Sequence, residues 1–436
     1  MSGLDYARAQ MGVSLAFHIV FAAAGVALPL FMVIADVLWM RSRNPVYREL
    51  SQRLAKGTAV LFAVGAVSGT VLSFELGLLW PRFMERFGAI IGLPFALEGF
   101  AFFTEAIFLG IYLYGRDRVS EGFHLFAGVV VAVSGAASAF FVTLVNAFMN
   151  GPPAEALVPG AAALDPLVGM WSPSWSTQVV HVLLASYEAT AFAMAGIHAA
   201  LLLRDPTREL HRRALAIALA VAATTAIVQP LSGDRSAKHV AAAQPIKLAA
   251  LEAQFASETG APLRIGGLPD VEARRVHAAI EIPGGLSFLS FGRFDARVRG
   301  LEEFPREEWP PVVGVHLAFQ VMVGTGTALA GLGALAALLA LRRRRLPDAR
   351  PFLMALVVAT PLGFVALEAG WLVTEWGRQP WVVRGLMRTA DAVTPVLHRA
   401  WPFWVFTAVY LLLGVVVALL LARQFRATAP GKGGGA

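Results

Sequence analysis

The sequence has no cysteine among its 436 residues, and it has few charges. The lack of thiols excludes disulfides, iron–sulfur clusters, thiolate zinc sites and covalent haem attachment through a Cys-x-x-Cys-His motif. Charged residues make up only 15% of the chain, whereas soluble domains have about 25%. Hydrophobic residues reach 57%, and the mean hydropathy is +0.64. A soluble protein could not bury this much apolar surface, so the composition predicts several membrane spans.

The net charge of +7 does not indicate a nucleic-acid partner. Basic residues mostly occupy short turns between apolar runs, where they orient membrane spans. The sequence shows no convincing internal repeat, so it gives no support to an inverted-repeat transporter. Because the first apolar stretch is long enough to span a bilayer, we expect no cleaved signal peptide.

Nine apolar stretches, each of roughly twenty residues or more, are long enough to cross a bilayer. They cover residues of about 13–40, 57–80, 94–114, 123–147, 178–203, 212–231, 312–341, 352–374 and 402–422. The predicted fold class is an all-α, polytopic membrane helix bundle with about nine transmembrane helices. We expect helices 1–6 in residues 1–231, an extracytoplasmic loop in 232–311, and helices 7–9 with a cytoplasmic tail in 312–436.

The distribution of Lys and Arg predicts the orientation of these spans. One set of short loops carries most of the basic residues, within 41–56, 116–118, 204–213, 342–350 and the tail from 423. Basic loops stay in the cytoplasm, so we expect a cytoplasmic C-terminus. An odd number of spans then places the N-terminus and loop 232–311 outside. The Gly-rich end 431–436 is predicted to be a flexible tail.

Ionisable side chains inside membrane spans are costly and are therefore candidates for a functional site. The informative ones are His18, Glu75, Glu98, Glu105, His181, Glu188, His316, Glu368 and Glu375. With the predicted orientation, most of them and Met322 lie in one layer beneath the outer surface. Imidazole, thioether and oxygen groups are the axial ligands of haem iron, and a His with a Met gives low-spin iron. The sequence therefore predicts a buried haem site.

Other interpretations stay open at this point. Taken alone, a membrane His or Met is more often a packing residue than a ligand. A haem–copper centre is discounted because the histidines are dispersed. One alternative is a haem b electron-transfer subunit of another quinone-linked complex, and a second is a transporter that uses buried carboxylates. Glu98 and Glu105 share a helix face and suit a proton relay, but two structural acids would fit equally well.

Six motifs are more specific than these single residues, and they occur in order along nearly the whole chain. The most distinctive is Gly370–Trp381, which reads GWLVTEWGRQPW. The others are Ser14–His18, Leu97–Glu105, Val180–Tyr187, Lys247–Glu252 and Ala318–Met322. Together they resemble subunit I of the cytochrome bd quinol oxidases. The resemblance implies a terminal quinol:oxygen oxidoreductase of a bacterial cytoplasmic (inner) membrane, which reduces O2 to water and generates a proton gradient.

The resemblance also implies roles for individual residues. His181 and Met322 are the implied axial ligands of a low-spin haem b. His18 and Glu375 are the implied ligands of two high-spin haems, of which one is haem b and the third is haem d or haem b. The other implied roles are quinol binding by Lys247 and Glu252, proton transfer by Glu98, Glu105, Ser138 and Asn146, and contact with the high-spin haems by Arg378 and Trp371.

The sequence departs from the enterobacterial branch of this family at informative positions. Gln320 stands where that branch has Arg, and Glu75 stands where it has Gln, while loop 232–311 is short. These features resemble the cyanide-insensitive branch. The loss of a cation beside the low-spin haem should lower its potential. The implied partners are subunit II in a membrane heterodimer and a small single-span accessory subunit, together with quinol, O2 and the lipid bilayer.

Overall fold

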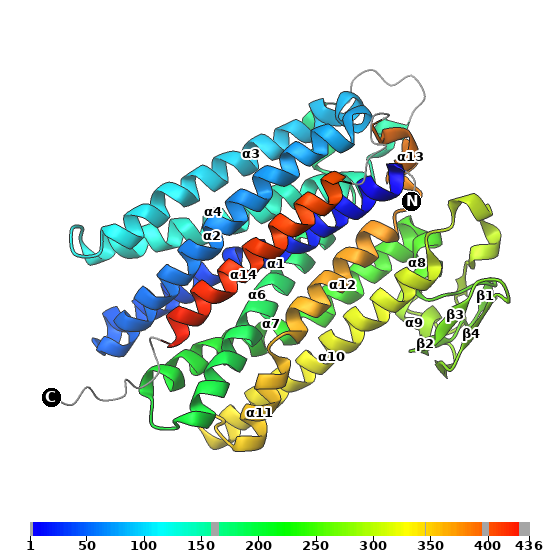
Figure 1. Ribbon diagram of the computed structural model, residues 1–436. Helices are drawn as coiled ribbons and strands as arrows, with labels where there is room; N and C mark the ends of the chain where they lie inside the picture. The colour runs from blue at the N-terminus through cyan, green and yellow to red at the C-terminus, as the bar shows by residue number, and fades with distance from the viewer. Residues whose placement is uncertain (1–2, 158–164, 345, 395–400, 427–436) are drawn as a thin grey trace.

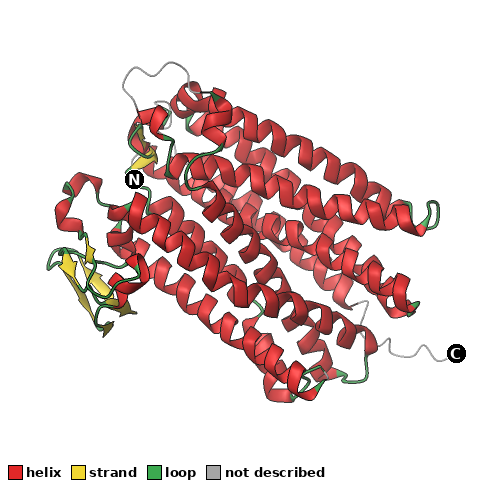
Figure 2. Ribbon diagram, turned by 180° about the vertical axis from the view of Figure 1, so that it is seen from behind, coloured by secondary structure: helices red, strands yellow, loops and turns green. Residues whose placement is uncertain are grey.

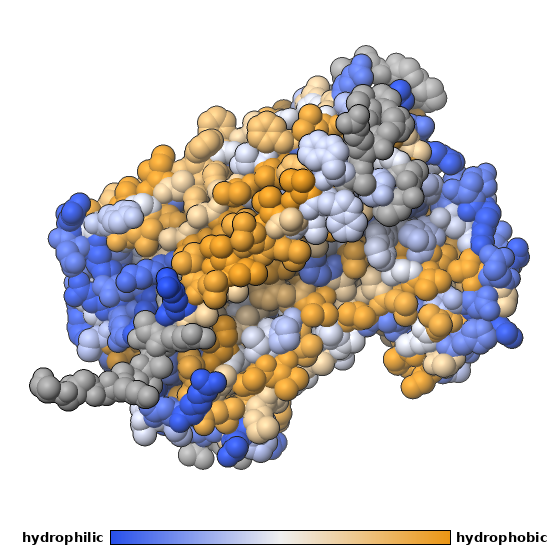
Figure 3. Space-filling model, in the orientation of Figure 1, coloured by the Kyte–Doolittle hydropathy of each residue, from blue (hydrophilic) through white to orange (hydrophobic). Residues whose placement is uncertain are grey.

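The computed structural model describes residues 3–157, 165–344, 346–394 and 401–426 (Figure 1). Within these ranges the chain is mostly long α-helices (Figure 2). Nine helical segments of the described chain are long and apolar enough to cross a membrane, which confirms the predicted fold class. Hydrophilic residues gather at both ends of the helices and apolar residues lie between them (Figure 3). Arg345 and the predicted tail 431–436 lie outside the described residues.

The long helices correspond to the predicted spans. They are α1 (Gly3–Ser42), α2 (Pro45–Leu79), α3 (Pro81–Tyr114), α4 (Glu121–Asn150), α6 (Trp175–Arg204), α7 (Glu209–Ala243), α10 (Val312–Arg343), α11 (Arg350–Ala359), α12 (Leu362–Trp376) and α14 (Trp401–Arg426). Local sequence explains several of their starts. Asn44 accepts a hydrogen bond from the Val46 N–H at 3.0 Å, and Pro45 occupies the first turn of α2, where no N–H is needed.

Two predicted boundaries differ from the structure. The expected span 352–374 is two helices, because α11 ends at Ala359 and α12 starts after Pro361, which has no N–H to continue the helix. The sixth span was expected to end at residue 231, where polar residues begin. Helix α7 instead continues to Ala243. Polar residues do not end a helix by themselves, and Lys238 and Asp234 form a 2.7 Å ion pair one turn apart within this extension.

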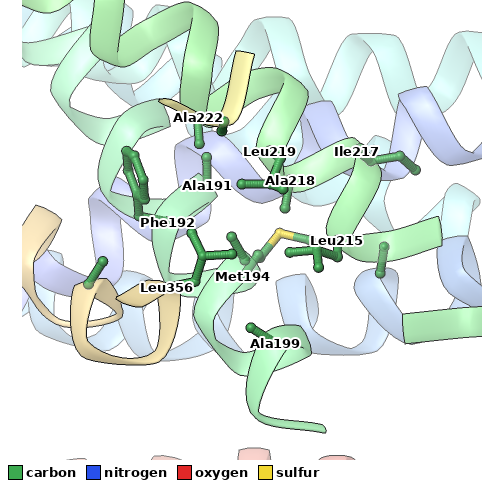
Figure 4. Close-up of a cluster of buried hydrophobic side chains, with 14 of the residues drawn as sticks. Ala191, Phe192, Met194, Ala199, Leu215, Ile217, Ala218, Leu219, Ala222 and Leu356 are labelled. Atoms are coloured by element: carbon green, nitrogen blue, oxygen red, sulfur yellow. The ribbon is translucent and has the colours of Figure 1, made fainter. Parts of the chain in front are cut away.

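The spans form two groups of four helices. Helices α1, α2, α3 and α4 contact one another in a ring, and so do α6, α7, α10 and α12. Helix α6 contacts both α1 and α4 and thereby joins the groups, while α14 packs on α1 and α2. The largest core lies around α6, α7 and α11, where small and large apolar side chains interdigitate, among them Ala191, Phe192, Leu215, Ala222 and Leu356 (Figure 4).

The segment between α7 and α10 forms a small domain of short elements, which we call the outer domain after the side of the membrane on which the sequence predicts it. It contains α8 (Pro245–Leu251), β1 (Glu258–Thr259), β2 (Leu263–Ile265), β3 (Leu268–Asp270), β4 (Arg275–His277), β5 (Ile280–Ile282), α9 (Gly285–Phe291) and β6 (Arg297–Val298). The strand pairs are β1 with β6, β2 with β5, and β3 with β4, all antiparallel. This domain lies at the same end of the bundle as the start of α1 (Figure 1).

The remaining described elements are short. They are α5 (Pro166–Met170), α13 (Thr389–Ala392), β7 (Trp381–Val383), β8 (Met387–Arg388) and the 3-10 turns Ala154–Leu157, Leu301–Glu303 and Arg306–Glu308. Strands β7 and β8 pair and contact α4 and α13. They therefore close the outer end of the bundle above the α1–α4 group.

Candidate functional site

His18 lies on α1 with its ring directed at α2. Its Nδ1 is 2.9 Å from the Ser68 Oγ, and that hydroxyl donates to the Val64 carbonyl at 2.8 Å. Because the Ser68 hydroxyl donates its hydrogen in this way, its oxygen accepts a hydrogen bond from the His18 Nδ1–H, and Nε2 keeps its lone pair. Gly69 faces the same ring, and a Cβ there would lie 3.1 Å from the His18 Cε1. The imidazole is thus oriented by Ser68 and packs against a residue that has no side chain.

His181 on α6 has a similar arrangement with α7, and in addition the Gln229 Nε2 lies 3.3 Å from its Nε2 and 3.4 Å from its Nδ1. Its Nδ1 is 2.9 Å from the Ser232 Oγ, which donates to the Gln229 carbonyl at 2.9 Å. Gly233 follows, and a Cβ there would lie 3.5 Å from the His181 Cε1. The extension of α7 beyond residue 231 is what carries Ser232 and Gly233. A histidine whose second nitrogen is held in this way is the usual form of a metal-ligating imidazole.

Met322 lies on α10, in the same four-helix group as His181. A Cβ at Gly370 of α12 would lie 3.1 Å from the Met322 Sδ, so the glycine lets α12 approach the thioether closely. Thus three of the predicted iron ligands each have a glycine against the donor group. The glycines let the neighbouring helices pack closely against these donor groups, and the donor set of imidazoles and a thioether fits haem.

Glu375 is the centre of a polar chain at the outer end of α12. Its Oε1 accepts from the Asn146 Nδ2 at 2.6 Å, and its Oε2 accepts from the Arg378 Nη2 at 2.5 Å. The Asn150 Nδ2 donates to the Asn146 Oδ1 at 2.9 Å, and the Lys247 Nζ donates to the Asn150 Oδ1 at 3.0 Å. Side chains from α4, α8 and α12 therefore meet around this one carboxylate.

Arg378 is buried, and two of its nitrogens, Nε and Nη1, have no hydrogen-bond partner among the described residues. A buried guanidinium in this state needs an acceptor, since an unpaired buried donor costs free energy. The carboxylate groups that haem carries on its rim would satisfy it. Trp371, one turn before Glu375 on the same helix, is half-buried.

Glu98 and Glu105 both face α4 from α3. The Glu98 Oε1 accepts from the Ser138 Oγ at 2.9 Å, and Glu105 lies against Gly135, where a Cβ would be 3.4 Å from its Oε2. Glu105 is buried and Glu98 half-buried. The predicted shared face is thus present, and Ser138 belongs to it.

Lys247 and Glu252, the predicted quinol pair, have different surroundings. Lys247 is buried and belongs to the chain that ends at Glu375, whereas Glu252 follows the last turn of α8 and lies near Arg264. Burial, with the nearby Arg378 guanidinium, lowers the pKa of the Lys247 ammonium to about 7. Burial also raises the pKa of the Glu252 carboxyl to about 7, against the opposing effect of Arg264.

His316, which the sequence left undecided, is pinned by the outer domain. Its Nδ1 is 2.8 Å from the Leu251 carbonyl and its Nε2 is 3.3 Å from the Gly266 carbonyl. Because both ring nitrogens of His316 face backbone carbonyls, neither is directed at an open site, and we interpret His316 as a structural residue. Of the other buried acids, Glu75 accepts from the Gln10 Nε2 at 2.9 Å. Glu188 and Glu368 each have one buried oxygen with no partner in the described chain.

Ser68, Gly69, Ser232 and Gly233 were not selected from the sequence. Each pair is a Ser-Gly dipeptide within an apolar stretch or at its end, opposite a histidine on the neighbouring helix. That repeated dipeptide was the available signal, but single sequences contain many Ser-Gly pairs. Only the helix packing shows which ones meet a histidine.

Comparisons with known proteins identify the family of the chain. The family model for cytochrome bd terminal oxidase subunit I matches residues 6–429. A Bacillus subtilis (strain 168) protein, described provisionally as a cytochrome bd menaquinol oxidase subunit I, is 37% identical over 98% of this chain and 97% of its own length. Cytochrome bd ubiquinol oxidase subunit 1 of the same strain is 28% identical over 98% of this chain and 94% of its own.

A solved structure shows the same fold. The bd oxidase from Geobacillus thermodenitrificans superposes with a TM-score of 0.92 and 39% sequence identity, over 98% of this chain and 99% of that chain. The fold and the buried donor set define a membrane-bound terminal oxidase subunit. The chain belongs to the cytochrome bd terminal oxidase subunit I family, whose members are the catalytic subunits of quinol oxidases and carry haems.

Proposed function

We propose that His181 and Met322 hold a low-spin haem b and that His18 and Glu375 hold two high-spin haems, one haem b and the other haem d or haem b. The two matched histidine–serine pairs carry this proposal, because each serine oxygen accepts from Nδ1 and so fixes the tautomer in which Nε2 carries the lone pair, while a glycine packs against each ring. When bound, the haems would supply the electron carriers and the oxygen-binding iron. Arg378 and Trp371 would line the high-spin site, with the free Arg378 nitrogens directed to a haem carboxylate.

The outer domain is proposed to bind quinol through Glu252 and Lys247. Glu252 has one buried oxygen without a partner in the described chain, so it can accept a proton from a quinol hydroxyl. Lys247 uses two of its protons on Asn150 and the Thr374 carbonyl, which leaves a third for a quinone oxygen. The hydrogen bonds from Lys247 through Asn150 and Asn146 connect the proposed quinol site to Glu375.

Glu105 and Glu98 are proposed to deliver protons from the cytoplasmic side to the oxygen-reducing site. Ser138 and Asn146 on α4 lie along the same route, since each donates to one of the carboxylates of the site. Proton uptake from the cytoplasm and release from quinol outside make the reaction electrogenic. The chain is proposed to act in a bacterial cytoplasmic membrane with subunit II and a small single-span accessory subunit.

The assignment of the low-spin ligands is tested by His181→Ala and Met322→Leu in the whole oxidase complex. Both variants should lose the low-spin haem band and quinol oxidation, because His–Met ligation keeps the iron six-coordinate. His198→Ala is the control: His198 lies on the same helix, its Nδ1 faces His211 at 3.2 Å, and its loss should leave that band in place. Full low-spin spectra in both ligand variants would contradict the assignment.

The quinol site is tested by its pH dependence. With a Glu252 pKa of about 7, the carboxylate that accepts the quinol proton becomes more populated as the pH rises through 7. The kcat/KM for quinol should therefore rise between about pH 5 and pH 7, the range in which the Lys247 ammonium still keeps its third proton, and Glu252→Gln should remove this rise with haem spectra intact. Glu307→Gln, at an exposed position of the same domain, is the control. A rise that persists in Glu252→Gln would assign the proton acceptor to another group.

A further inference from the structure

The outer domain contains a bent two-stranded ribbon, defined here as residues 263–282. Strands β2 and β3 follow one another, interrupted at Gly266 and Gly267, which have φ of 69° and 96°. The returning chain, β4 then β5, is interrupted opposite them at Ala278, whose φ is 57°. The two interruptions face each other, so both strands change direction together and the ribbon has an apex there.

Two side chains of α10 fix the position of this apex. The Gly266 N–H donates to the Gln320 Oε1 at 2.9 Å, and the Gln320 Nε2 donates to the Arg264 carbonyl at 3.0 Å. His316 approaches the Gly266 carbonyl from one turn earlier. Gln320 lies eight residues after the start of α10 at Val312, which is about 12 Å along the helix. The apex therefore lies beside the membrane-spanning helix and below its outer end.

The side chains around the apex are apolar and exposed. Ile265 and Ile280 face each other across the ribbon and are 49% and 68% exposed, and Leu268 is 54% exposed. The opposite face of the same strands carries Arg264 and Glu281, which form a 2.9 Å ion pair. The ribbon is thus amphipathic. Exposed hydrophobic clusters of this kind mark an interaction surface.

The adjoining surface of α10 indicates what covers this cluster. Leu317 and Val321 are exposed at the depth of the apex. They belong to the apolar surface that a spanning helix presents to lipid. In the space-filling view an apolar tip of the outer domain turns back alongside the helices (Figure 3). The apex of the ribbon and this face of α10 are therefore expected to contact lipid at the same depth.

We propose that the apex of ribbon 263–282 inserts into the outer-leaflet interface of the lipid bilayer, with Ile265, Leu268 and Ile280 among the acyl chains. The Gln320 amide satisfies backbone groups that water could no longer reach at that depth. The outer domain is then held at the membrane surface from which a lipid-soluble quinol arrives. This inference concerns the lipid contact alone and does not depend on the residue assignments of the quinol site.

Spin-label accessibility tests the proposal directly. Because the chain has no cysteine, Ile280→Cys carries a single nitroxide, and the unsubstituted complex shows any label on other subunits. The matched control is Glu272→Cys at the far end of the same ribbon, where the Glu272 side chain is 93% exposed. Both complexes are reconstituted in nanodiscs of phosphatidylethanolamine and phosphatidylglycerol. Retained haem spectra show that each has folded.

The label at 280 should be reached more readily by O2 than by a water-soluble nickel chelate, at a depth of about 5–10 Å below the lipid phosphates. The label at 272 should show the reverse preference. A label at 280 that behaves like the one at 272 would place the apex in water, and a label that neither reagent reaches would mean that protein covers it; either result overturns the proposal. Leu268→Cys gives the same reading if Ile280→Cys does not assemble.

Discussion

One serine hydroxyl group beside each histidine of the site sets the tautomer and the orientation of its ring. The hydroxyls of Ser68 and Ser232 both donate a hydrogen bond to a backbone carbonyl, so their oxygens act only as acceptors toward the histidine. This fixes the Nδ1–H tautomer in His18 and His181 without any charged residue. In a low-dielectric bundle, a neutral acceptor avoids the cost of burying another carboxylate.

Replacement of this acceptor should weaken the low-spin site. In Ser232→Ala the His181 Nδ1–H loses the hydroxyl oxygen that accepts its hydrogen bond, so the ring is free to turn away from the proposed iron position. Loss of such an outer partner costs about 10–100-fold in affinity or activity. We expect quinol oxidation to fall by about that factor, and the low-spin band to disappear at a lower temperature in an absorbance melt. Ser236→Ala, one turn further along α7, should behave like the unsubstituted protein.

At the same scale, Glu105→Gln separates proton delivery from electron input. The amide keeps the size of the side chain but cannot release a proton, so oxygen turnover should slow by about 100-fold, the lower range for loss of a proton-transfer group. The low-spin haem should still be reduced by quinol. Time-resolved voltage measurements after mixing the reduced enzyme with O2 should lack the fast phase. Glu85→Gln, at an exposed position on the same helix, is the control; a normal fast phase in Glu105→Gln would transfer the role to another group.

At the scale of elements, the sequence predicted the spans because a twenty-residue apolar run has few other solutions. It could not predict the end of α7, since Ser232 and Asp234 read as loop residues although they continue the helix. It also missed the break at Pro361, which apolar composition conceals. The candidate ligands were found by their motifs, whereas the burial of Lys247 beneath the outer domain depends on packing between distant segments.

The contact between α10 and α12 depends on Gly370. In Gly370→Val the added carbons meet the Met322 Sδ, because even a Cβ would lie 3.1 Å from it. The thioether should be displaced from the iron, and low-spin haem should become high-spin without loss of total haem by extraction. Gly331→Val on α10 is the matched control, since a Cβ there meets nothing within 4 Å among the described residues. A low-spin band that survives in Gly370→Val would exclude Met322 from ligation.

At the scale of the whole molecule, the two four-helix groups enclose polar groups that lack partners within the described chain. Arg378, Glu188 and Glu368 each bury at least one such atom. An unsatisfied buried group costs about 1–3 kcal/mol, so the protein should depend on its cofactors for stability. The complex produced in haem-limited cells should melt at a lower temperature and be cleaved faster by trypsin. Identical melting of haem-depleted and haem-replete protein would show that these atoms find other partners.

The polar chain around Glu375 has a consequence for biosynthesis. Its members lie at positions 146, 150, 247, 375 and 378, so they emerge from the ribosome at widely separated times. A nascent chain that has inserted α1–α4 already contains His18 with its serine, yet it has neither Glu375 nor the arginine that pairs with it. The proposed high-spin pocket is therefore completed only when nearly nine-tenths of the polypeptide has been made. Iron porphyrin delivered earlier would find His18 in place but neither Glu375 nor Arg378.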